Sequence, residues 1–377
     1  MRFIATADWQ LGMTAHYLSA EARPRFHRAR LDAVRRIGEL ASEHGAEFVV
    51  VCGDVFESNQ LDRAIISRTF EVLSSFTVPV VLLPGNHDPL DAASIYDSPV
   101  FVSRRPEHVH VLRDSTPTEV VPGTEIVGAP WFSKRPQGDL VAEATGDLAE
   151  VPAGTVRIIA GHGAVSTLNP DRDSLATIDV DHLRRVLGEG RAQFAVLGDR
   201  HATYRVDERI WYPGSPEVTS RREDDPGNVL LVDVDAETHA CSVEKLQVGQ
   251  WSYRVLDADL NSIEDVGRFE QRLAELPDKD RTAVWLILRG TLSTAAKTRL
   301  DEVIDHAQDL FALVSLWERH TDIAVIAADE DFAGLGLSGF TQQALDDLSS
   351  MAVGEDGTAR AAQDALGLLY RFARSGS

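Results

Sequence analysis

Five short apolar segments of this chain each stop just before residues of types that bind metal ions. Apolar, largely β-branched runs that end at glycine or a polar residue predict buried strands. The polar side chain that follows then lies at the carboxyl end of its strand, which is where ligands bind in sheets flanked by helices. We therefore expect one shared site. The segments are residues 3–7 before Asp8, 48–52 before Asp54, 80–83 before Asn86, 156–160 before His162, and 194–197 before Asp199 and His201.

Helical patterns separate these strands over the first 250 residues. Apolar side chains recur at helical spacing over residues 28–41 and again over residues 65–73. Strands that alternate with helices are typical of an α/β domain, here a layered one with β-sheets flanked by helices. Further strands are predicted at residues 109–112, 125–129, 209–212 and 229–234.

The sequence predicts three segments. Residues 1–249 carry the metal-ligand types and form the metal-binding domain. Residues 250–332 continue the strand and helix patterns without clustered metal-ligand residues, so we expect a small α+β capping domain there. Residues 333–377 begin with a glycine-rich stretch and end in an apolar stripe at helical spacing, which predicts a C-terminal helical hairpin. This stripe either packs on its own chain or docks a partner helix.

The composition limits the compartment and the partners. The 377 residues include 37 Lys and Arg against 59 Asp and Glu, a net charge of −22. Such a chain has no general attraction for nucleic acid, so a phosphate path would depend on local arginine clusters such as Arg104-Arg105 and Arg221-Arg222. No apolar run approaches the roughly 20 residues that span a bilayer, and there is no signal-peptide pattern. With two distant cysteines, we expect a cytoplasmic protein without membrane contact.

The expected ligands suit a centre with two divalent ions. Such a pair lowers the pKa of a bound water and neutralises phosphate charge, which is the chemistry that phosphodiester hydrolysis needs. Asp54 follows a glycine and is a good bridging carboxylate, Asp8 supplies a second carboxylate and Asn86 a neutral oxygen. His162 and His201 add imidazole nitrogens. This mixture of oxygen and nitrogen donors favours manganese, magnesium, iron or zinc over a metal that prefers thiolates.

His87 follows Asn86 directly, so its side chain points elsewhere than that of its neighbour. A histidine beside a metal centre can protonate a leaving oxygen. We therefore expect His87 to be the general acid and Asp88 to orient it.

The motifs resemble those of the calcineurin-like metallophosphoesterase superfamily, which read Asp-x-His, Gly-Asp, Gly-Asn-His-Asp/Glu, His and Gly-His-x-His. Within it the chain is most similar to SbcD-type nucleases, the nuclease subunits of complexes that process DNA breaks. The resemblance extends by motif over residues 1–235. The finer match lies in residues 7–12 (Ala-Asp-Trp-Gln-Leu-Gly), 53–56 (Gly-Asp-Val-Phe) and 212–215 (Tyr-Pro-Gly-Ser).

The resemblance implies a two-metal centre with His87 as its catalytic histidine. It also implies that Asp54 belongs to both ions. The two implied ligand sets are Asp8, Gln10, Asp54 and His201 for one ion, and Asp54, Asn86, His162 and Asp199 for the other.

Two positions depart from the superfamily pattern. Gln10 and Asp199 both stand where the motifs have histidine. Glutamine is a weak neutral donor, so the first ion is bound more loosely or Gln10 only hydrogen-bonds a metal-bound water. Asp199 adds a third carboxylate beside Asp8 and Asp54, which favours hard divalent ions, manganese first, with magnesium or iron as alternatives. Loss of one ion would leave a mononuclear or weakly active enzyme.

Three functions are compatible with these motifs. The first is a manganese-dependent DNA nuclease of DNA repair and recombination, exonuclease or endonuclease, which works with an SbcC-type coiled-coil ATPase, as the resemblance implies. The second is a metallophosphoesterase with a small phosphodiester or a phosphoprotein as substrate. The third is a degenerate, non-hydrolytic subunit of a DNA complex, which Gln10 and Asp199 motivate. A homodimer would also fit the resemblance.

Overall fold

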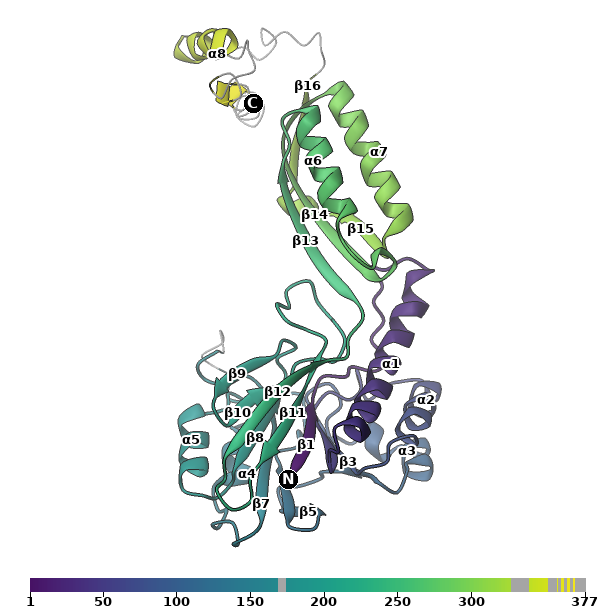
Figure 1. Ribbon diagram of the computed structural model, residues 1–377, viewed down its shortest axis with the longest axis vertical. Helices are drawn as coiled ribbons and strands as arrows, with labels where there is room; N and C mark the ends of the chain where they lie inside the picture. Colours follow the sequence, from purple (N-terminus) through teal and green to yellow (C-terminus); the bar gives the residue numbers. More distant parts are fainter. Residues whose placement is uncertain are drawn as a thin grey trace. The chain divides into compact units, whose positions relative to one another are not determined.

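The computed structural model describes residues 1–168, 174–326 and 339–351, together with positions 358, 361, 362, 365, 366 and 369. The chain divides into two compact units, Met1–Trp251 and Ser252–Ser377, whose sheets and helices are drawn in Figure 1. Every residue expected to bind metal lies in the first unit. The predicted C-terminal hairpin of residues 333–377 falls mostly outside the described residues.

The first sheet of the Met1–Trp251 unit has the strand order β12-β11-β1-β2-β3-β4. Strands β1 to β4 are parallel, whereas β11 and β12 extend the sheet with antiparallel pairs. Parallel neighbours require crossover connections, and helices α1 and α2 lie in two of them. The elements are β1 Arg2–Thr6, α1 Ala22–Glu43, β2 Phe48–Cys52, α2 Arg63–Leu73, β3 Val80–Leu83, η1 Ile95–Asp97, α3 Pro99–Arg104, β4 Val109–Val111, β11 Asn228–Val234 and β12 Cys241–Gln247.

The second sheet has the strand order β5-β6-β7-β8-β10-β9. Its central strands β6, β7, β8 and β10 are parallel, and an antiparallel strand closes each edge. The elements are β5 Thr118–Val121, β6 Thr124–Gly128, α4 Leu140–Thr145, β7 Val156–His162, α5 Val180–Gly188, β8 Phe194–Gly198, β9 Tyr204–Asp207 and β10 Ile210–Tyr212.

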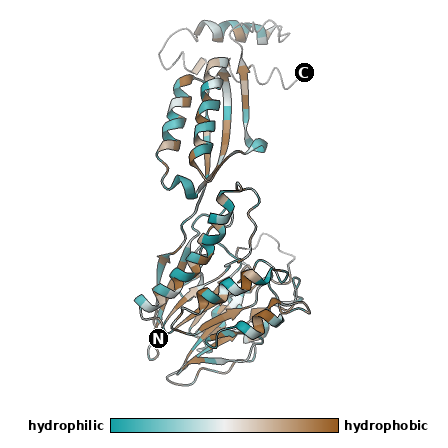
Figure 2. Cartoon of the chain, turned by 90° about the vertical axis from the view of Figure 1, so that its right-hand side faces the viewer, coloured by the Kyte–Doolittle hydropathy of each residue, from teal (hydrophilic) through white to brown (hydrophobic). Residues whose placement is uncertain are grey.

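The two sheets pack face to face, and helices cover their outer faces. In β2, for example, Val49 and Val51 belong to the cluster that includes α1 and α2, whereas Phe48 belongs to the cluster between the sheets. This alternation follows the two-residue period of a strand. Between the sheets the Phe3 ring stacks on Phe48 at 4.9 Å and meets the edge of Phe194 at 6.2 Å. Figure 2 shows the apolar residues concentrated on the strands. The predicted layered α/β fold is confirmed.

The helices of this unit are longer than the periodicity alone predicts. Helix α1 begins at Ala22, not at Arg28, because Pro24 falls in its first turn, where a missing N–H costs no intrahelical bond. Helix α2 begins just after Asp62, whose carboxylate accepts from the Ala64 N–H as an N-cap. Both helices end at or close to the predicted residues.

The Ser252–Ser377 unit has a small sheet of four strands in which every pairing is parallel. Parallel neighbours require crossovers, and α6 and α7 lie in the connections from β13 to β14 and from β14 to β15. Its apolar core lies between this sheet and helices α6 and α7. Ser262 is the N-cap of α6, since its side chain accepts from the Asp265 N–H. Among the described residues no helix is long and apolar enough to cross a membrane. The elements are β13 Ser252–Asp259, α6 Ile263–Ala274, η2 Lys279–Arg281, β14 Thr282–Ser293, α7 Thr294–Leu310, β15 Leu313–Leu316, η3 Glu318–His320, β16 Asp322–Ile326 and α8 Phe340–Met351.

Candidate metal centre

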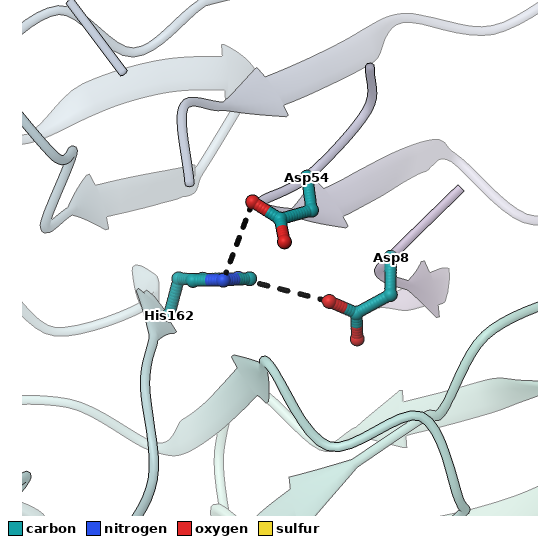
Figure 3. A group of neighbouring side chains, drawn as sticks. All are labelled: Asp8, Asp54 and His162. Carbon is teal, nitrogen blue, oxygen red and sulfur yellow. Dashed lines mark ion pairs between the residues drawn. The ribbon is translucent and has the colours of Figure 1, made fainter. Parts of the chain in front are cut away.

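Two buried carboxylates and one buried imidazole meet where strands of both sheets end. Asp8 follows β1, Asp54 follows β2, and His162 is the last residue of β7. Each offers one ligand atom, and these atoms all lie within 4.8 Å of one another (Figure 3). His162 Nε2 is 3.5 Å from Asp54 Oδ1, and His162 Nδ1 is 4.0 Å from Asp8 Oδ1. The expected shared site therefore lies across the ends of two packed sheets.

The backbone at this site is strained and closely packed. Asp8 and Asp54 both have a φ of 52°, a left-handed conformation that costs a non-glycine residue about 1–3 kcal/mol. The Asp8 N–H donates to Gly53 O at 3.0 Å, which ties the two loops together. Gly53, at a φ of 89°, has no room for a side chain, since a Cβ there would lie 2.0 Å from His162 Nδ1. The Gly-Asp pair of the sequence is thus explained by the close approach of the imidazole.

The His162 ring is held at both nitrogens. Its Nδ1 donates to Cys52 O at 2.9 Å, and its Nε2 lies 2.7 Å from Asn86 Oδ1. Burial favours the neutral ring, but the nearby Asp54 and Asp8 carboxylates raise the pKa of His162 well above its usual value. The contact with Nε2 brings Asn86 to the cluster, and its role as a metal ligand stays a prediction.

The pKa values of the two buried carboxyls shift in opposite directions. Burial raises the pKa of Asp8 to about 7. His201 and His162 act to lower this pKa, whereas the Asp54 and Asp199 carboxylates raise it further. Burial also acts on Asp54, but His162 and His87 lower the pKa of this carboxyl below its usual value. A divalent cation at this point would stabilise both anionic forms and displace the protons. The donor chemistry of the described residues therefore fits a metal ion held by Asp8, Asp54, Asn86 and His162.

Gln10 and His201 lie on another side of Asp8. His201 Nε2 is 3.1 Å from Gln10 Nε2 and 4.0 Å from Asp8 Oδ1. Its Nδ1 faces Thr219 Oγ1 at 2.6 Å and Glu223 Oε1 at 3.0 Å. Burial opposes the charged ring, but Glu223 and Asp8 raise the pKa of His201 to about 9. Sequence reasoning missed Thr219 and Glu223, because only the folded loop brings them to the ring.

Asp199 approaches the cluster through its backbone. Its N–H donates to Asp8 Oδ1 and Oδ2 at 3.0 and 3.2 Å. The residue is exposed, and it is not a member of the buried Asp8, Asp54 and His162 group. Its expected role as a carboxylate ligand stays a prediction.

His87 is partly exposed beside the centre. Its Nε2 lies 3.9 Å from Asp54 Oδ2, and its backbone N–H donates to Asp54 Oδ1 at 2.9 Å. Its Nδ1 donates to Glu57 O at 3.0 Å and is 3.8 Å from Glu57 Oε1. Because Nδ1 is engaged with a carbonyl, Nε2 is the nitrogen that can present a proton to a reacting group.

The expectation that Asp88 orients His87 is replaced by a different role. Asp88 is fully buried, and it accepts from Gly85 N at 2.8 Å, Phe56 N at 3.0 Å and the Tyr96 hydroxyl at 2.7 Å. Burial raises the pKa of Asp88 to about 6, with a further contribution from Asp54. Asp88 therefore fixes the loop that carries Asn86 and His87, while the Glu57 carbonyl holds the imidazole.

Residues 1–220 match the family model of calcineurin-like phosphoesterases. This span is more than half of the 377 residues, and the chain belongs to that family. The predicted superfamily is thereby confirmed, and the buried cluster is a metal-binding site of the metallophosphoesterase type.

Curated relatives share shorter stretches of sequence with this chain. It is 34% identical to the SbcD component of the SbcCD nuclease of Escherichia coli strain K12 over 91 residues, which cover 23% of this chain and 21% of the relative. It is 32% identical to the SbcD component of the SbcCD nuclease of Rhodobacter capsulatus over 117 residues, which cover 30% and 26%. The chain thus matches about a quarter of the length of these curated relatives.

Solved structures resemble the fold at low identity. The protein TT1561 of Thermus thermophilus aligns with a TM-score of 0.40 and 13% identity, over 66% of this chain and 98% of that chain. The nuclease MPE of Pseudomonas putida aligns with a TM-score of 0.28 and 15% identity, over 61% and 83%.

Proposed function

We propose that this chain hydrolyses phosphodiester bonds of DNA with two divalent metal ions, and that manganese is the preferred ion. The observation that carries the proposal is the buried group of Asp8, Asp54 and His162 with His87 beside it. The partial similarity to SbcD nucleases, together with the Tyr-Pro-Gly-Ser segment at residues 212–215, supports DNA as the substrate.

The residues divide the work as follows. When bound, the ions supply an activated hydroxide and neutralise charge on the phosphate. Asp8, Gln10, Asp54 and His201 would hold one ion. Asp54, Asn86, His162 and Asp199 would hold the other, so that Asp54 is shared by both.

His87 protonates the leaving oxygen. Its Nδ1–H stays with the Glu57 carbonyl, so the transferred proton leaves from Nε2. The bond from the His87 backbone N–H to Asp54 Oδ1 fixes the position of the imidazole relative to the ligands. The ring is therefore held in place before substrate arrives, which is the condition for efficient general acid catalysis.

The partners follow from the same proposal. An SbcC-type coiled-coil ATPase would supply the DNA affinity that a chain of net charge −22 lacks. We further propose residues 250–332 as a capping domain, residues 333–377 as the docking segment for that ATPase, and a homodimer as the assembled form.

The test is hydrolysis of linear single- and double-stranded DNA by the purified chain in manganese, beside the Asp54→Asn variant. Manganese-dependent cleavage that the variant lacks is the expected result. Asp32→Asn is the matched control, since Asp32 pairs with Arg35 on the surface of α1. Turnover of a small phosphodiester without DNA cleavage would replace DNA by a small substrate. No turnover of either, with an ATPase partner added, would indicate a non-hydrolytic subunit.

A further inference from the structure

The His201 ring is fixed by a loop that lies after the last metal motif. Its Nδ1 faces two oxygen atoms, Thr219 Oγ1 at 2.6 Å and Glu223 Oε1 at 3.0 Å. Its Nε2 faces the Gln10 amide at 3.1 Å and Asp8 Oδ1 at 4.0 Å. The Nδ1 atom therefore points to the Glu223 carboxylate, and the Nε2 atom points to the expected ligands Gln10 and Asp8.

Glu223 is itself held by its own loop. The Thr219 N–H donates to Glu223 Oε2 at 3.0 Å, and the Thr219 hydroxyl donates to Glu223 Oε1. A further backbone bond, from Glu223 N to Ser220 O at 3.2 Å, closes the turn. The Glu223 side chain is only 7% exposed. None of these contacts involves His201, so the Glu223 carboxylate is held in position independently of the ring.

We propose that Glu223, fixed by Thr219, is a positioning residue that holds the proton of His201 on Nδ1 and leaves the Nε2 lone pair as the metal-ligand atom. A carboxylate cannot donate, so the ring proton between the two groups belongs to Nδ1. Carboxylates on the far nitrogen of a ligand histidine orient the ring and make its other nitrogen a stronger donor. This role rests on the metal centre of the proposed function and does not depend on DNA as the substrate.

The two ligand histidines of this chain provide an internal contrast. The far nitrogen of His162 donates to a neutral acceptor, the Cys52 carbonyl, whereas that of His201 meets the charged Glu223. The histidine with the charged acceptor, His201, is the one that lies beside the neutral amide of Gln10. Glu223 thus makes the His201 imidazole a stronger metal ligand where its neighbour Gln10 is a weak one.

The proposal predicts weaker metal binding when the carboxylate is removed. Metal-free protein is titrated with manganese in a calorimeter, for the wild type, Glu223→Gln and Glu223→Ala. We expect an affinity about 10–100-fold lower for Glu223→Ala and a smaller loss for Glu223→Gln, whose amide oxygen can still accept. Glu208→Ala is the matched control, because Glu208 is exposed and pairs only loosely with Arg205, at 3.7 Å. An affinity of Glu223→Ala within twofold of the wild type overturns the proposal.

A second measurement reads the ring proton itself, in the wild type and in Glu223→Ala. In wild-type protein with ¹⁵N-labelled histidine, loaded with zinc as a diamagnetic probe, we expect His201 to coordinate through Nε2 and to show an Nδ1–H signal protected from solvent exchange. The same signal should exchange rapidly in Glu223→Ala. Coordination through Nδ1, or an Nδ1–H signal that Glu223→Ala leaves unchanged, would mean that Glu223 only closes its loop. Neither measurement uses DNA, so a failure of the proposed substrate is distinguishable from a failure of this role.

Discussion

His162 and His201 each approach the same oxygen of Asp8 to 4.0 Å, yet their surroundings differ. The His162 side chain is fully buried, whereas that of His201 is 25% exposed. His162 lies among Asp8, Asp54 and Asn86, and we call this group the inner side. His201 also lies near Asp8 and contacts Gln10, and we call His201 and Gln10 the outer side.

The difference shows how the chain stabilises each side. On the inner side, two carboxylates and an imidazole compensate one another in a buried space, so that the removal of one leaves uncompensated charge. On the outer side, an amide replaces the usual imidazole, and Glu223 supplies the compensating charge from a loop. We therefore expect the inner side to contribute more to the stability of the site, and the outer side to set how tightly the proposed second ion would be held.

The largest expected effect comes from removing the inner imidazole. His162→Ala should lower manganese affinity by more than the roughly 10–100-fold that loss of an outer-shell partner costs, and by more than His201→Ala does. Loss of His162 also leaves Asp8 and Asp54 buried with less compensating charge, so the free energy of unfolding of the metal-free protein should fall by about 3–5 kcal/mol. Titration calorimetry and denaturant unfolding measure the two quantities. Equal losses for both variants would contradict the division into an inner and an outer side.

The next effect concerns chemistry without metal binding. His87→Ala should lower kcat on DNA by about 10²–10⁴-fold, because the leaving alkoxide loses its proton donor. On an activated nitrophenyl phosphodiester, whose leaving group needs little protonation, the loss should be less than about tenfold. Manganese affinity should stay unchanged, and exposed His16 gives the matched control His16→Ala. An equal loss on both substrates would argue that His87 acts on the ligands, since its backbone bonds Asp54.

The sequence predicted the inner side well because its residues follow strands. Asp8, Asp54 and His162 each end a buried apolar run, and the parallel order of the strands brings those ends together. The chain order of the motifs was thus sufficient to predict which side chains meet. It did not reveal that two sheets contribute, because pairing between sheets leaves no local pattern in the sequence.

The sequence could not predict the contacts made by loops. Because Asp88 follows His87 directly, the sequence suggested that Asp88 orients His87. Neighbouring side chains in a turn point apart, however, and Asp88 instead accepts from the Gly85 N–H of its own loop. Glu57 and Glu223 were missed for the same reason. Their positions depend on turn geometry and on tertiary contacts, such as the bond from Thr219 N to Glu223 Oε2.

A smaller effect is the pH dependence of metal binding. In the metal-free protein the pKa of Asp8 is about 7 and that of His201 is about 9, both above the ordinary values. The folded centre therefore holds more protons than the unfolded chain. The stabilisation from Asp8 is present below pH ~4 and is lost as the pH rises through about 7. That from His201 is present below pH ~6.5 and is lost as the pH rises through about 9.

A bound ion displaces these protons, so metal affinity should rise with pH. Between pH ~6.5 and ~8.5 we expect about a tenfold gain in manganese affinity per pH unit for each displaced proton. His201→Gln should flatten the upper part of this slope, because it removes the group that titrates highest. Calorimetry in buffers of different ionisation enthalpy counts the released protons directly. A manganese affinity independent of pH would show that the centre is already deprotonated.

The smallest effect sharpens the contrast between the two sides. Gln10→His restores an imidazole on the outer side, and histidine tolerates the left-handed φ of 44° better than most residues. We expect a gain of about 3–10-fold in affinity for the second ion and a shift in preference from manganese towards zinc, because imidazole is the softer donor. Competition between the two metals, read by elemental analysis, measures the shift, with exposed Gln60→His as the control. If neither affinity nor preference changes, residue 10 does not touch the ion, and the outer side is held by His201 and the shared carboxylates alone. The effect of Glu223→Ala should then be at its largest, since no second neutral donor would remain to compensate for a weakened imidazole.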